Sequence, residues 1–413
     1  MKFGVFYEHQ LPRPWTDDDE LRILHEALDQ VVLADELGYD FAWEVEHHFL
    51  DEYSHSSAPE VFLAAAAART RRIRLGHGVR HVIPNYNHPA RTAEALATLD
   101  LVSNGRVEFG IGEGATRLEL GGFGIPAKHK RAMSLESAEQ IANMMVLEPY
   151  PGFDGEFFSM PCRNVVPKPH QKPHPPMWIA CTNRDTIKVA ARNGLGALAF
   201  SFVDPMEARA WVDIYYDIIK SDECVPLGHT VNANIALVSG FSLHEDRTEA
   251  IRRGHEGFDF FAYAMNALVA DDTTPGRTDL WGEFQAARGN RTEMLIRRAL
   301  AAGDAYASAI GTPDDARRFL DGMVEAGVDQ VIFLQQAGRN RHDHICESLE
   351  LFAEEVLADY HRGDGARAEA KAAELAPHIE AALGRKQWMR PLRDAEIPVV
   401  EASVKKAQSS GRI

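Results

Sequence analysis

Histidines and carboxylates gather directly after the second short apolar run of the chain. The segment 43–49 reads Trp-Glu-Val-Glu-His-His-Phe. Because successive side chains of a strand point to opposite faces, Glu46 and His48 are expected to share one direction and His47 to take the other. A histidine aimed into a pocket can act as a general acid or base near neutral pH, and a nearby carboxylate can set its tautomer. The alternative interpretation is that these histidines are polar strand-end residues bonded to backbone.

The histidine pairs also raise the question of a metal ion. No His-Glu-x-x-His motif occurs, and neighbouring His47 and His48 cannot easily chelate one ion from an extended strand. His77 and His81 would lie about 13 Å apart on a fully extended strand. The sequence therefore predicts that no metal is bound.

Two later segments have residue types that suit an anion or a flat ligand. Segment 110–114, Gly-Ile-Gly-Glu-Gly, would let a ligand approach the backbone closely, or would serve a tight barrel corner. Segment 180–186 precedes a helix, and its hydroxyls, amide, arginine and N–H groups suit a phosphate. An ordinary helix cap by Thr182, Asn183 or Asp185 explains this second segment equally well.

The hydrophobic pattern predicts a scaffold in which short strands alternate with helices, the last helix covering 344–361. This alternation predicts the α/β class and a TIM-type (β/α)₈ barrel. An open doubly wound sheet would require a Gly-x-Gly-x-x-Gly loop after the first strand, and residues 8–14 contain no glycine. The predicted strands are Lys2–Tyr7, Asp40–Val45, Ile73–Val79, Arg106–Ile111, Pro176–Cys181, Gly196–Phe202, Asn232–Phe241 and Asp329–Leu334.

Two insertions interrupt the repeat, 112–175 after strand four and 242–310 after strand seven, and the second is rich in aromatic residues. Segments that follow barrel strands lie at the ligand-binding face, so both insertions are candidate lids, with ordinary apolar packing as the alternative. We expect the barrel to span 1–362. An Ala-rich and charged helical extension with a polar tail is expected over 363–413.

The composition excludes several classes of protein. Of 413 residues, 45% are hydrophobic and 25% are charged, which is typical of a globular chain. The net charge of −17 repels phosphodiester backbones, so no nucleic-acid partner is expected. No run approaches the ~18 apolar residues of a membrane helix. The first residues read as a strand and not as a signal peptide, which favours a cytoplasmic protein. Four cysteines without a Cys-x-x-Cys pair predict neither a disulfide framework nor a zinc ribbon.

A co-linear series of short motifs runs through residues 1–360. The series comprises Met1-Lys2-Phe3-Gly4-Val5-Phe6, Gly38-Tyr39-Asp40, Glu46-His47-His48-Phe49, Pro84-x-x-x-His88-Pro89-x-Arg91, Ser103-x-Gly105-Arg106-x-x-x-Gly110, segment 180–186, Gly311-Thr312-Pro313 and Ala326-Gly327-Val328-Asp329. With Glu-His-His-Phe as its most specific element, this series resembles the bacterial-luciferase-like flavin monooxygenases.

The resemblance implies a (β/α)₈ barrel that binds reduced FMN supplied by a separate flavin reductase. In that family dioxygen adds to the flavin, and the resulting hydroperoxide oxygenates the substrate. His47 matches the family's catalytic histidine. Glu46, His48, Phe261 and Trp281 are expected to line the pocket of a small, largely apolar organic substrate.

The resemblance also implies cofactor contacts, which are Gly78 and Val79 at the strand-three bulge beside the isoalloxazine, Phe200 and Ser201 under the flavin, Gly112 and Glu113 after strand four, and Thr182, Asn183, Arg184 and Thr186 around the phosphate. Luciferase has a cysteine and then an arginine where this chain has Gly112 and Glu113. Because an acid cannot pair with a phosphate, phosphate binding is expected to rest on Arg184 and backbone N–H groups. The departure also argues against luciferase-like light emission.

Two other functions stay open from the sequence. One is an oxidoreductase of the same barrel superfamily that transfers hydride with a deazaflavin, which the acidic charge and Glu113 disfavour. The other is a non-catalytic flavin-binding protein. The resemblance further implies a homodimer, for which the small-residue run Ala64–Ala68 within the predicted helix Ser57–Arg71 would allow close helix packing. Simple packing of this helix on the barrel is the alternative.

Overall fold

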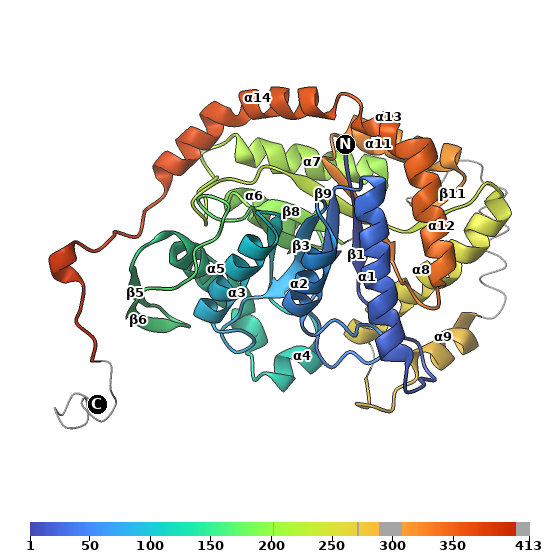
Figure 1. The fold of residues 1–413 in the computed structure, drawn as a ribbon, viewed down its shortest axis with the longest axis horizontal. Coiled ribbons are helices and arrows are strands. Elements are labelled where there is room, and N and C mark those ends of the chain that lie inside the picture. Colours follow the sequence, from blue (N-terminus) through green and yellow to red (C-terminus); the bar gives the residue numbers. More distant parts are fainter. Residues whose placement is uncertain (201, 271, 289–307, 402–413) are drawn as a thin grey trace.

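The computed structural model describes residues 1–200, 202–270, 272–288 and 308–401. Eight parallel strands close into a barrel in the order β1-β12-β9-β8-β7-β4-β3-β2 (Figure 1). The predicted α/β barrel is therefore confirmed, and each of the eight predicted strands overlaps one strand of the barrel. These are β1 (Lys2–Tyr7), β2 (Phe41–Glu44), β3 (Arg74–His81), β4 (Val107–Gly112), β7 (Met177–Cys181), β8 (Gly196–Ala199), β9 (Ile235–Ser239) and β12 (Gln330–Gln335).

The outer helices begin and end at residues that favour those positions. Proline stands in the first turn of α2, α3, α7 and α11, where its missing N–H is not needed. Gly38 ends α1 with a φ of 93°, a left-handed conformation that favours glycine. The helices around the barrel are α1 (Asp19–Leu37), α2 (Pro59–Arg69), α3 (Pro89–Val102), α5 (Lys130–Val146), α6 (Arg184–Arg192), α7 (Pro205–Ile219), α11 (Pro313–Ala326) and α12 (His342–Phe352).

The barrel interior holds large aromatic rings, and glycines make room for them. A Cβ atom at Gly76 would lie 2.2 Å from Cε3 of Trp43. A Cβ atom at Gly110 would lie 2.0 Å from the carbonyl oxygen of His77. The pairing of β3 with β4 shifts register between His77 and Arg80. This bulge bends β3 at the mouth of the barrel, and so β3 can present backbone and side chains to a ligand there.

Both insertions contain secondary structure that the sequence did not predict. The first holds α4 (Arg117–Gly122), η1 (Ala127–His129), α5 and a hairpin of β5 (Tyr150–Asp154) with β6 (Ser159–Arg163). The predicted strand over 232–241 is wrong in its extent, because the backbone divides at Gly240 into β9 and β10 (Phe241–Leu243). Strand β10 pairs with β11 (Ala309–Gly311) outside the barrel. Between them lie α8 (Arg247–Ala270) and α9 (Leu280–Arg288).

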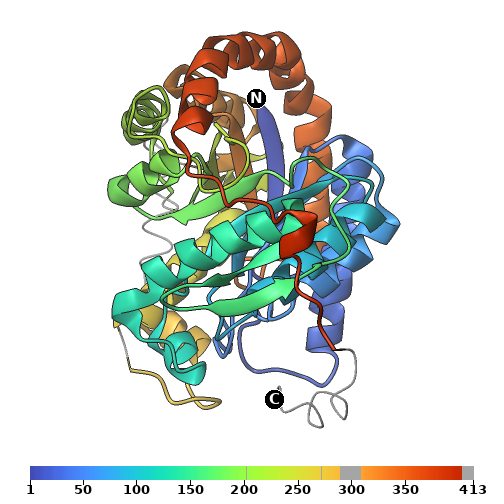
Figure 2. The ribbon, with the colours of Figure 1, turned by 90° about the vertical axis from the view of Figure 1, so that its left-hand side faces the viewer.

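The predicted helix over 344–361 is divided into α12, a π-helical turn η2 (Ala353–Leu357) and α13 (Ala358–His361). Helix α14 (Asp364–Arg385) then crosses the end of the barrel where the chain begins (Figures 1 and 2). The amino group of Met1 lies 2.6 Å from Oδ1 of Asp364, and Nζ of Lys371 lies 2.6 Å from Oδ1 of Asp329. Within the described ranges, no helix has the length and apolar character that a membrane crossing requires.

Candidate active site

The candidate site is built on an ion pair at the carboxyl ends of β1 and β2. His47 follows β2, and its Nδ1 lies 2.8 Å from Oε1 of Glu119, which is fully buried in α4. Glu119 is fixed by a capping box, because its backbone N–H bonds the hydroxyl of Thr116 and its carboxylate accepts in return from Thr116. The other ring nitrogen of His47, Nε2, lies 3.7 Å from Oε2 of Glu8. His47 is therefore placed between two buried carboxylates.

The charges of this group favour a protonated histidine. Burial disfavours the imidazolium, but the carboxylates of Glu119 and Glu8 outweigh burial and raise the pKa of His47 to about 9. Burial raises the pKa of Glu8 to about 7, against the opposing effect of His47. Burial also disfavours ionised Glu119, but His47 and His81 outweigh it and lower the pKa of that carboxyl. The raised pKa values favour a proton on His47 near neutral pH and leave Glu8 able to gain or lose a proton there.

A second carboxylate network lies beside the first and ties the loop after β2 to β3. Oε1 of Glu46 lies 3.1 Å from Nε2 of His48, and Oε2 accepts a 2.9 Å bond from the backbone N–H of His81. The amide of Asn87 donates to the same carboxylate. Burial raises the pKa of Glu46, but the bond to His48 and the charges of His81 and Arg80 outweigh it and bring the pKa to about 2. The ring of His48 packs on Tyr86 and Phe123 at the rim.

Three of these groups form a set of potential metal ligands. One ligand atom each from His47, His81 and Glu119 lies within 4.8 Å of the other two. Two imidazoles and one carboxylate form a donor set that divalent transition metals accept. Sequence reasoning considered histidines in pairs that are close in the chain, including His342 and His344 at a helix start, and such pairs do not include His47 with His81. The expectation of no metal stays a prediction.

Apolar side chains from the second insertion cover the site. Phe261 packs against Tyr53 at a ring distance of 5.6 Å, and Tyr53 donates a hydrogen bond to Glu8. Trp281 packs against Phe260, and Phe200 against Phe6 inside the barrel. These rings belong to one buried cluster that continues into the barrel interior. Phe200, Phe261 and Trp281 are thus brought together, whereas the predicted Ser201 lies outside the described residues.

A single carboxylate joins this cover to the loop that carries His47. Glu52 is completely buried and accepts hydrogen bonds from the backbone N–H groups of Arg13, Leu280 and Trp281. Leu280 and Trp281 are the first residues of α9. The carboxylate therefore occupies the N-terminus of α9, where negative charge is favoured, and fixes that helix relative to β1 and β2.

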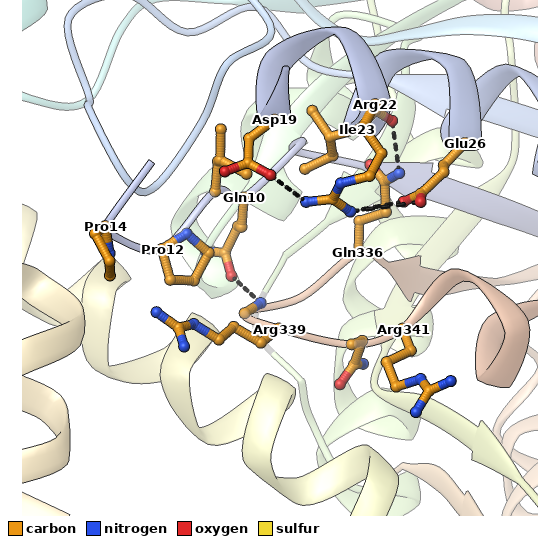
Figure 3. Close-up of a pocket in the computed structure, with 13 residues that line it drawn as sticks. Gln10, Pro12, Pro14, Asp19, Arg22, Ile23, Glu26, Gln336, Arg339 and Arg341 are labelled. Carbon is orange, nitrogen blue, oxygen red and sulfur yellow. Dashed lines mark hydrogen bonds and ion pairs between the residues drawn. The ribbon is translucent and has the colours of Figure 1, made fainter. Parts of the chain in front are cut away.

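A polar cavity of about 340 Å³ lies beside the segments that follow β1 and β12 (Figure 3). It lies between the N-terminal turns of α1 and the segments that follow β1 and β12. Arg22 is held there between Asp19 and Glu26. Arg339 donates to the carbonyl oxygen of Arg13 and lies over the ring of Trp281, 4.6 Å from its centre. Arg339 therefore links Trp281 of the aromatic cover to the segment that follows β1.

The predicted phosphate region contains cations that the sequence analysis missed. After β4, Glu113 forms ion pairs with Arg131 and Lys130, which open α5. The guanidinium of Arg131 also lies close enough to Cys181, at the end of β7, for the two groups to interact electrostatically. Arg184 instead pairs with Glu207 on the exposed surface. The cationic groups beside the ends of β4 and β7 are therefore Lys130 and Arg131.

The other predicted phosphate contacts at the start of α6 form a helix cap whose side chains and backbone N–H groups hydrogen-bond to one another. The side chain of Asn183 accepts from the N–H groups of Asp185 and Thr186. The hydroxyl of Thr186 accepts from the N–H groups of Thr182 and Asn183. Gly112 lies under Val79, since a Cβ atom there would approach Cγ2 of Val79 to 2.4 Å. Gly78 and Val79 form the β3 bulge.

Sequence reasoning also missed Glu8 and Glu119. Glu8 directly follows β1, and this position at the active face of a barrel was the available signal. For Glu119, the Thr-x-x-Glu capping-box pattern 116–119 predicted a helix start, but nothing in the sequence relates that start to His47.

The structure is thus a (β/α)₈ barrel that places a histidine between two buried carboxylates at its mouth, beneath aromatic side chains. The comparisons identify the family: the model described as "Luciferase-like monooxygenase" matches residues 1–330, and the chain belongs to this family.

Among curated relatives, the chain is 33% identical over 201 residues to "uncharacterized protein y4wF" of Sinorhizobium fredii, covering 47% of this chain and 54% of the relative. It is 28% identical over 197 residues to the oxygenase component of the flavin-dependent trigonelline monooxygenase of Acinetobacter baylyi, covering 47% and 52%. The matched part of the chain thus spans about half the length of these relatives.

Solved structures share the fold. Monooxygenase RslO1 from Streptomyces bottropensis matches with a TM-score of 0.69 and 28% identity, covering 87% of this chain and all of the other. The oxygenating constituent of 3,6-diketocamphane monooxygenase from Pseudomonas putida, in complex with FMN, matches with a TM-score of 0.66 and 19% identity, covering 86% and 98%. A coenzyme F420-dependent tetrahydromethanopterin reductase from Methanopyrus kandleri matches with a TM-score of 0.60 and 21% identity, covering 87% and 99%.

Proposed function

We propose that this protein is the oxygenase component of a two-component flavin monooxygenase. It would take reduced FMN from a separate reductase and use dioxygen to oxygenate a small, largely apolar organic substrate. The observation that carries the proposal is the position of His47 between the carboxylates of Glu119 and Glu8, under an aromatic cover at the barrel mouth. The FMN complex of the diketocamphane monooxygenase, the flavin dependence of the trigonelline enzyme and its name as an oxygenase component support the choice of cofactor and of a reductase partner.

The residues present fit a flavin mononucleotide. A phosphate requires cations and hydrogen-bond donors, and Arg131 and Lys130 lie beside the ends of β4 and β7. A flat aromatic ring requires an apolar surface, which Val79 on the bulge and Phe200 at the end of β8 would provide. When bound, reduced flavin would supply the electrons that activate dioxygen.

The chain's own groups would then do two things. His47 would hold a proton at Nε2 and donate it to negative charge that develops at the mouth, while Glu119 fixes the ring orientation through Nδ1. The aromatic rings of Phe261 and Trp281, with α9 held by Glu52, would exclude water from the reacting groups. The same apolar lining would favour a substrate without charge.

The cofactor is tested by anaerobic titration of the purified protein with reduced FMN and, in parallel, with the reduced deazaflavin. We expect saturable binding of reduced FMN and weak binding of the deazaflavin, whose acidic tail meets a chain of net charge −17. Preferential binding of the deazaflavin would instead favour hydride transfer. Binding of FMN without oxygen-dependent conversion of any apolar substrate would favour a non-catalytic flavin-binding protein.

The partner and location remain parts of the proposal. We propose no nucleic-acid or membrane partner, a cytoplasmic location and a homodimer. For the organisation of the chain, we propose that 1–362 form the catalytic barrel and that 363–413 form an extension, whose helix α14 is anchored on the barrel through Asp364 and Lys371.

A further inference from the structure

The ring of His81, at the end of β3, is buried beside the ion pair of His47 and Glu119. His81 is 2% exposed, and among the described residues neither ring nitrogen has a hydrogen-bond partner. Nε2 lies 3.5 Å from Oε1 of Glu119, which is longer than a good hydrogen bond. A buried imidazole that has lost its hydrogen bonds to water costs free energy unless a further group binds it. The chemistry proposed for His47 gives this ring no role.

Contacts on both sides hold the ring of His81 in place. Its backbone N–H donates a 2.9 Å bond to Oε2 of Glu46, and its carbonyl oxygen accepts from the amide of Asn87. The ring stacks on Tyr86 with a centroid distance of 4.4 Å and an interplanar angle of 17°. These contacts fix the orientation of the ring and use neither of its nitrogens, so Nε2 stays directed toward Glu119.

His47, His81 and Glu119 form a compact set of donor atoms. Nδ1 of His47 lies 2.8 Å, and Nε2 of His81 lies 3.5 Å, from Oε1 of Glu119. One donor atom from each residue lies within 4.8 Å of the other two. Donors bound tetrahedrally to a zinc ion at about 2.1 Å lie about 3.4 Å from one another. The spacing therefore suits an ion between the three side chains, with small side-chain adjustments.

Neighbouring groups support this donor set from outside. Oε2 of Glu119 accepts from the hydroxyl of Thr116, so Oε1, which also accepts from the backbone N–H of His48, is the oxygen that faces the two histidines. Nε2 of His47 faces Oε2 of Glu8 at 3.7 Å, and that oxygen is buried with no hydrogen-bond partner in the part of the chain that the structure describes. A histidine that binds a metal usually directs its other nitrogen to a carboxylate, which fixes the ring. Glu8 occupies that position.

We propose that His47, His81 and Glu119 bind a divalent transition-metal ion such as Zn²⁺, with water completing its coordination. The ion would take the place of the proton between His47 and Glu119, because a histidine binds a metal through a deprotonated nitrogen. The proposal departs from the expectation of no metal, since its ligands come from the loop after β2, the end of β3 and α4.

The binding test uses the purified full-length protein, freed of metals with a chelator and without flavin. Co²⁺ should give visible d–d absorption that saturates at one ion per chain, and excess Zn²⁺ should remove it. His81→Phe and Glu119→Gln should each weaken Zn²⁺ binding by about 100-fold or more, and Glu8→Gln by roughly tenfold. His25→Gln, at an exposed histidine on α1, should change nothing. Absence of the d–d bands, or equal Zn²⁺ affinity in His81→Phe, would overturn the proposal.

X-ray absorption of zinc in the wild type makes the test independent of how the variants fold. The spectrum should show nitrogen and oxygen ligands at about 2.0–2.1 Å, with the outer scattering of two imidazoles. Sulfur scattering would place the zinc instead at Cys346 and His342 on α12, where Sγ and Nε2 lie 3.7 Å apart. That result, or scattering from fewer than two imidazoles, would overturn the proposal.

A bound ion would also regulate the reaction, and this consequence rests on the proposed function. A neutral, metal-bound imidazole is a weaker acid than an imidazolium, so zinc should slow proton donation by His47. When protein loaded with reduced FMN is mixed with dioxygen, Zn²⁺ should change the decay of the transient absorbance about as much as His47→Gln does. His81→Phe should remove this effect of zinc. If no transient forms without zinc, the proposed function fails while the binding test still decides the metal site. If zinc binds and leaves the decay unchanged, the regulatory role is wrong.

Discussion

Nδ1 of His47 lies 2.8 Å from Oε1 of Glu119, although the two residues are 72 positions apart in the sequence. One comes from the loop after β2 and the other from α4 in the first insertion. Because Nδ1 is occupied by this bond to a buried carboxylate, Nε2 is the ring nitrogen that remains available at the barrel mouth. In this arrangement Glu119 is a positioning residue, and His47 is the group that would meet a ligand.

Glu119→Gln should lower the pKa of His47 from about 9 toward its ordinary value, because the variant removes the carboxylate that favours the imidazolium. The measurement is an NMR titration of the histidine Cε1–H signals, assigned with His47→Gln. Glu20→Gln, which removes an exposed carboxylate bonded to His55, is the matched control and should leave His47 unchanged. An unchanged His47 titration in Glu119→Gln would contradict the proposed role of the pair.

The same pKa shift predicts how stability depends on pH. The pKa of His47 is raised from 6.5 to about 9 on folding. Its stabilising contribution is therefore fully present below pH 6.5 and is lost as the pH rises through 9. When urea unfolding is measured at a series of pH values between 6.5 and 9, the free energy of unfolding should decline as the pH rises. The decline should be shallower in His47→Gln than in the wild type. Equal slopes for the two proteins would show that His47 has no raised pKa.

Glu113→Gln should strengthen the binding of phosphate groups. Glu113 forms ion pairs with Arg131 and Lys130. A phosphate must break these ion pairs before it can bind the two cations, so the carboxylate competes with it. Calorimetry with FMN and with inorganic phosphate should show affinity raised by roughly two- to tenfold, with riboflavin binding unchanged. Glu139→Gln removes the same charge further along α5 and should change none of the three. Weaker FMN binding in Glu113→Gln would contradict this assignment.

Glu52→Gln should loosen α9, because an amide offers one acceptor where the carboxylate serves the N–H groups of Arg13, Leu280 and Trp281. We expect faster hydrogen exchange in the described part of α9 and more hydrogen peroxide released per flavin oxidised, with unchanged FMN affinity. Glu283→Gln, an exposed change on the same helix, is the control. If exchange accelerates while peroxide release stays at the wild-type level, α9 does not exclude water from the reaction.

Lys371→Met should destabilise the whole protein by about 1–3 kcal/mol. The ammonium group binds Asp329, Asn234 and the carbonyl oxygen of Ala233, and so ties α14 to the barrel. Thermal unfolding would report the loss. A cooperative transition at the wild-type temperature would show that α14 is not part of the folding unit.

The barrel was predictable because each strand is a local apolar run and each helix has its own start and stop signals. Pro59, Pro89 and Gly38 are such signals, and they act within a few residues. The β5–β6 hairpin was not predictable in the same way, since Pro151, Gly152 and Pro161 are residues that sheets usually disfavour.

The site was predictable only in part, for the same reason. Glu-His-His-Phe is contiguous, so His47 could be selected from the sequence. The partners Glu119 and His81 reach it only through the closure of the barrel and the path of the first insertion. The cation Arg131 was missed because its relation to Glu113 spans a helix start and a turn. Long-range contacts of this kind leave no periodic pattern in the sequence.

The most direct test of the proposed oxygenase function is rapid mixing of the protein, loaded with reduced FMN, with buffer that contains dioxygen. In the absence of substrate we predict an absorbance spectrum that differs from both reduced and oxidised FMN and persists before oxidised FMN returns. His47→Gln should shorten its lifetime or change its decay with pH. Immediate return to oxidised FMN, with no distinct spectrum in between, would contradict the account.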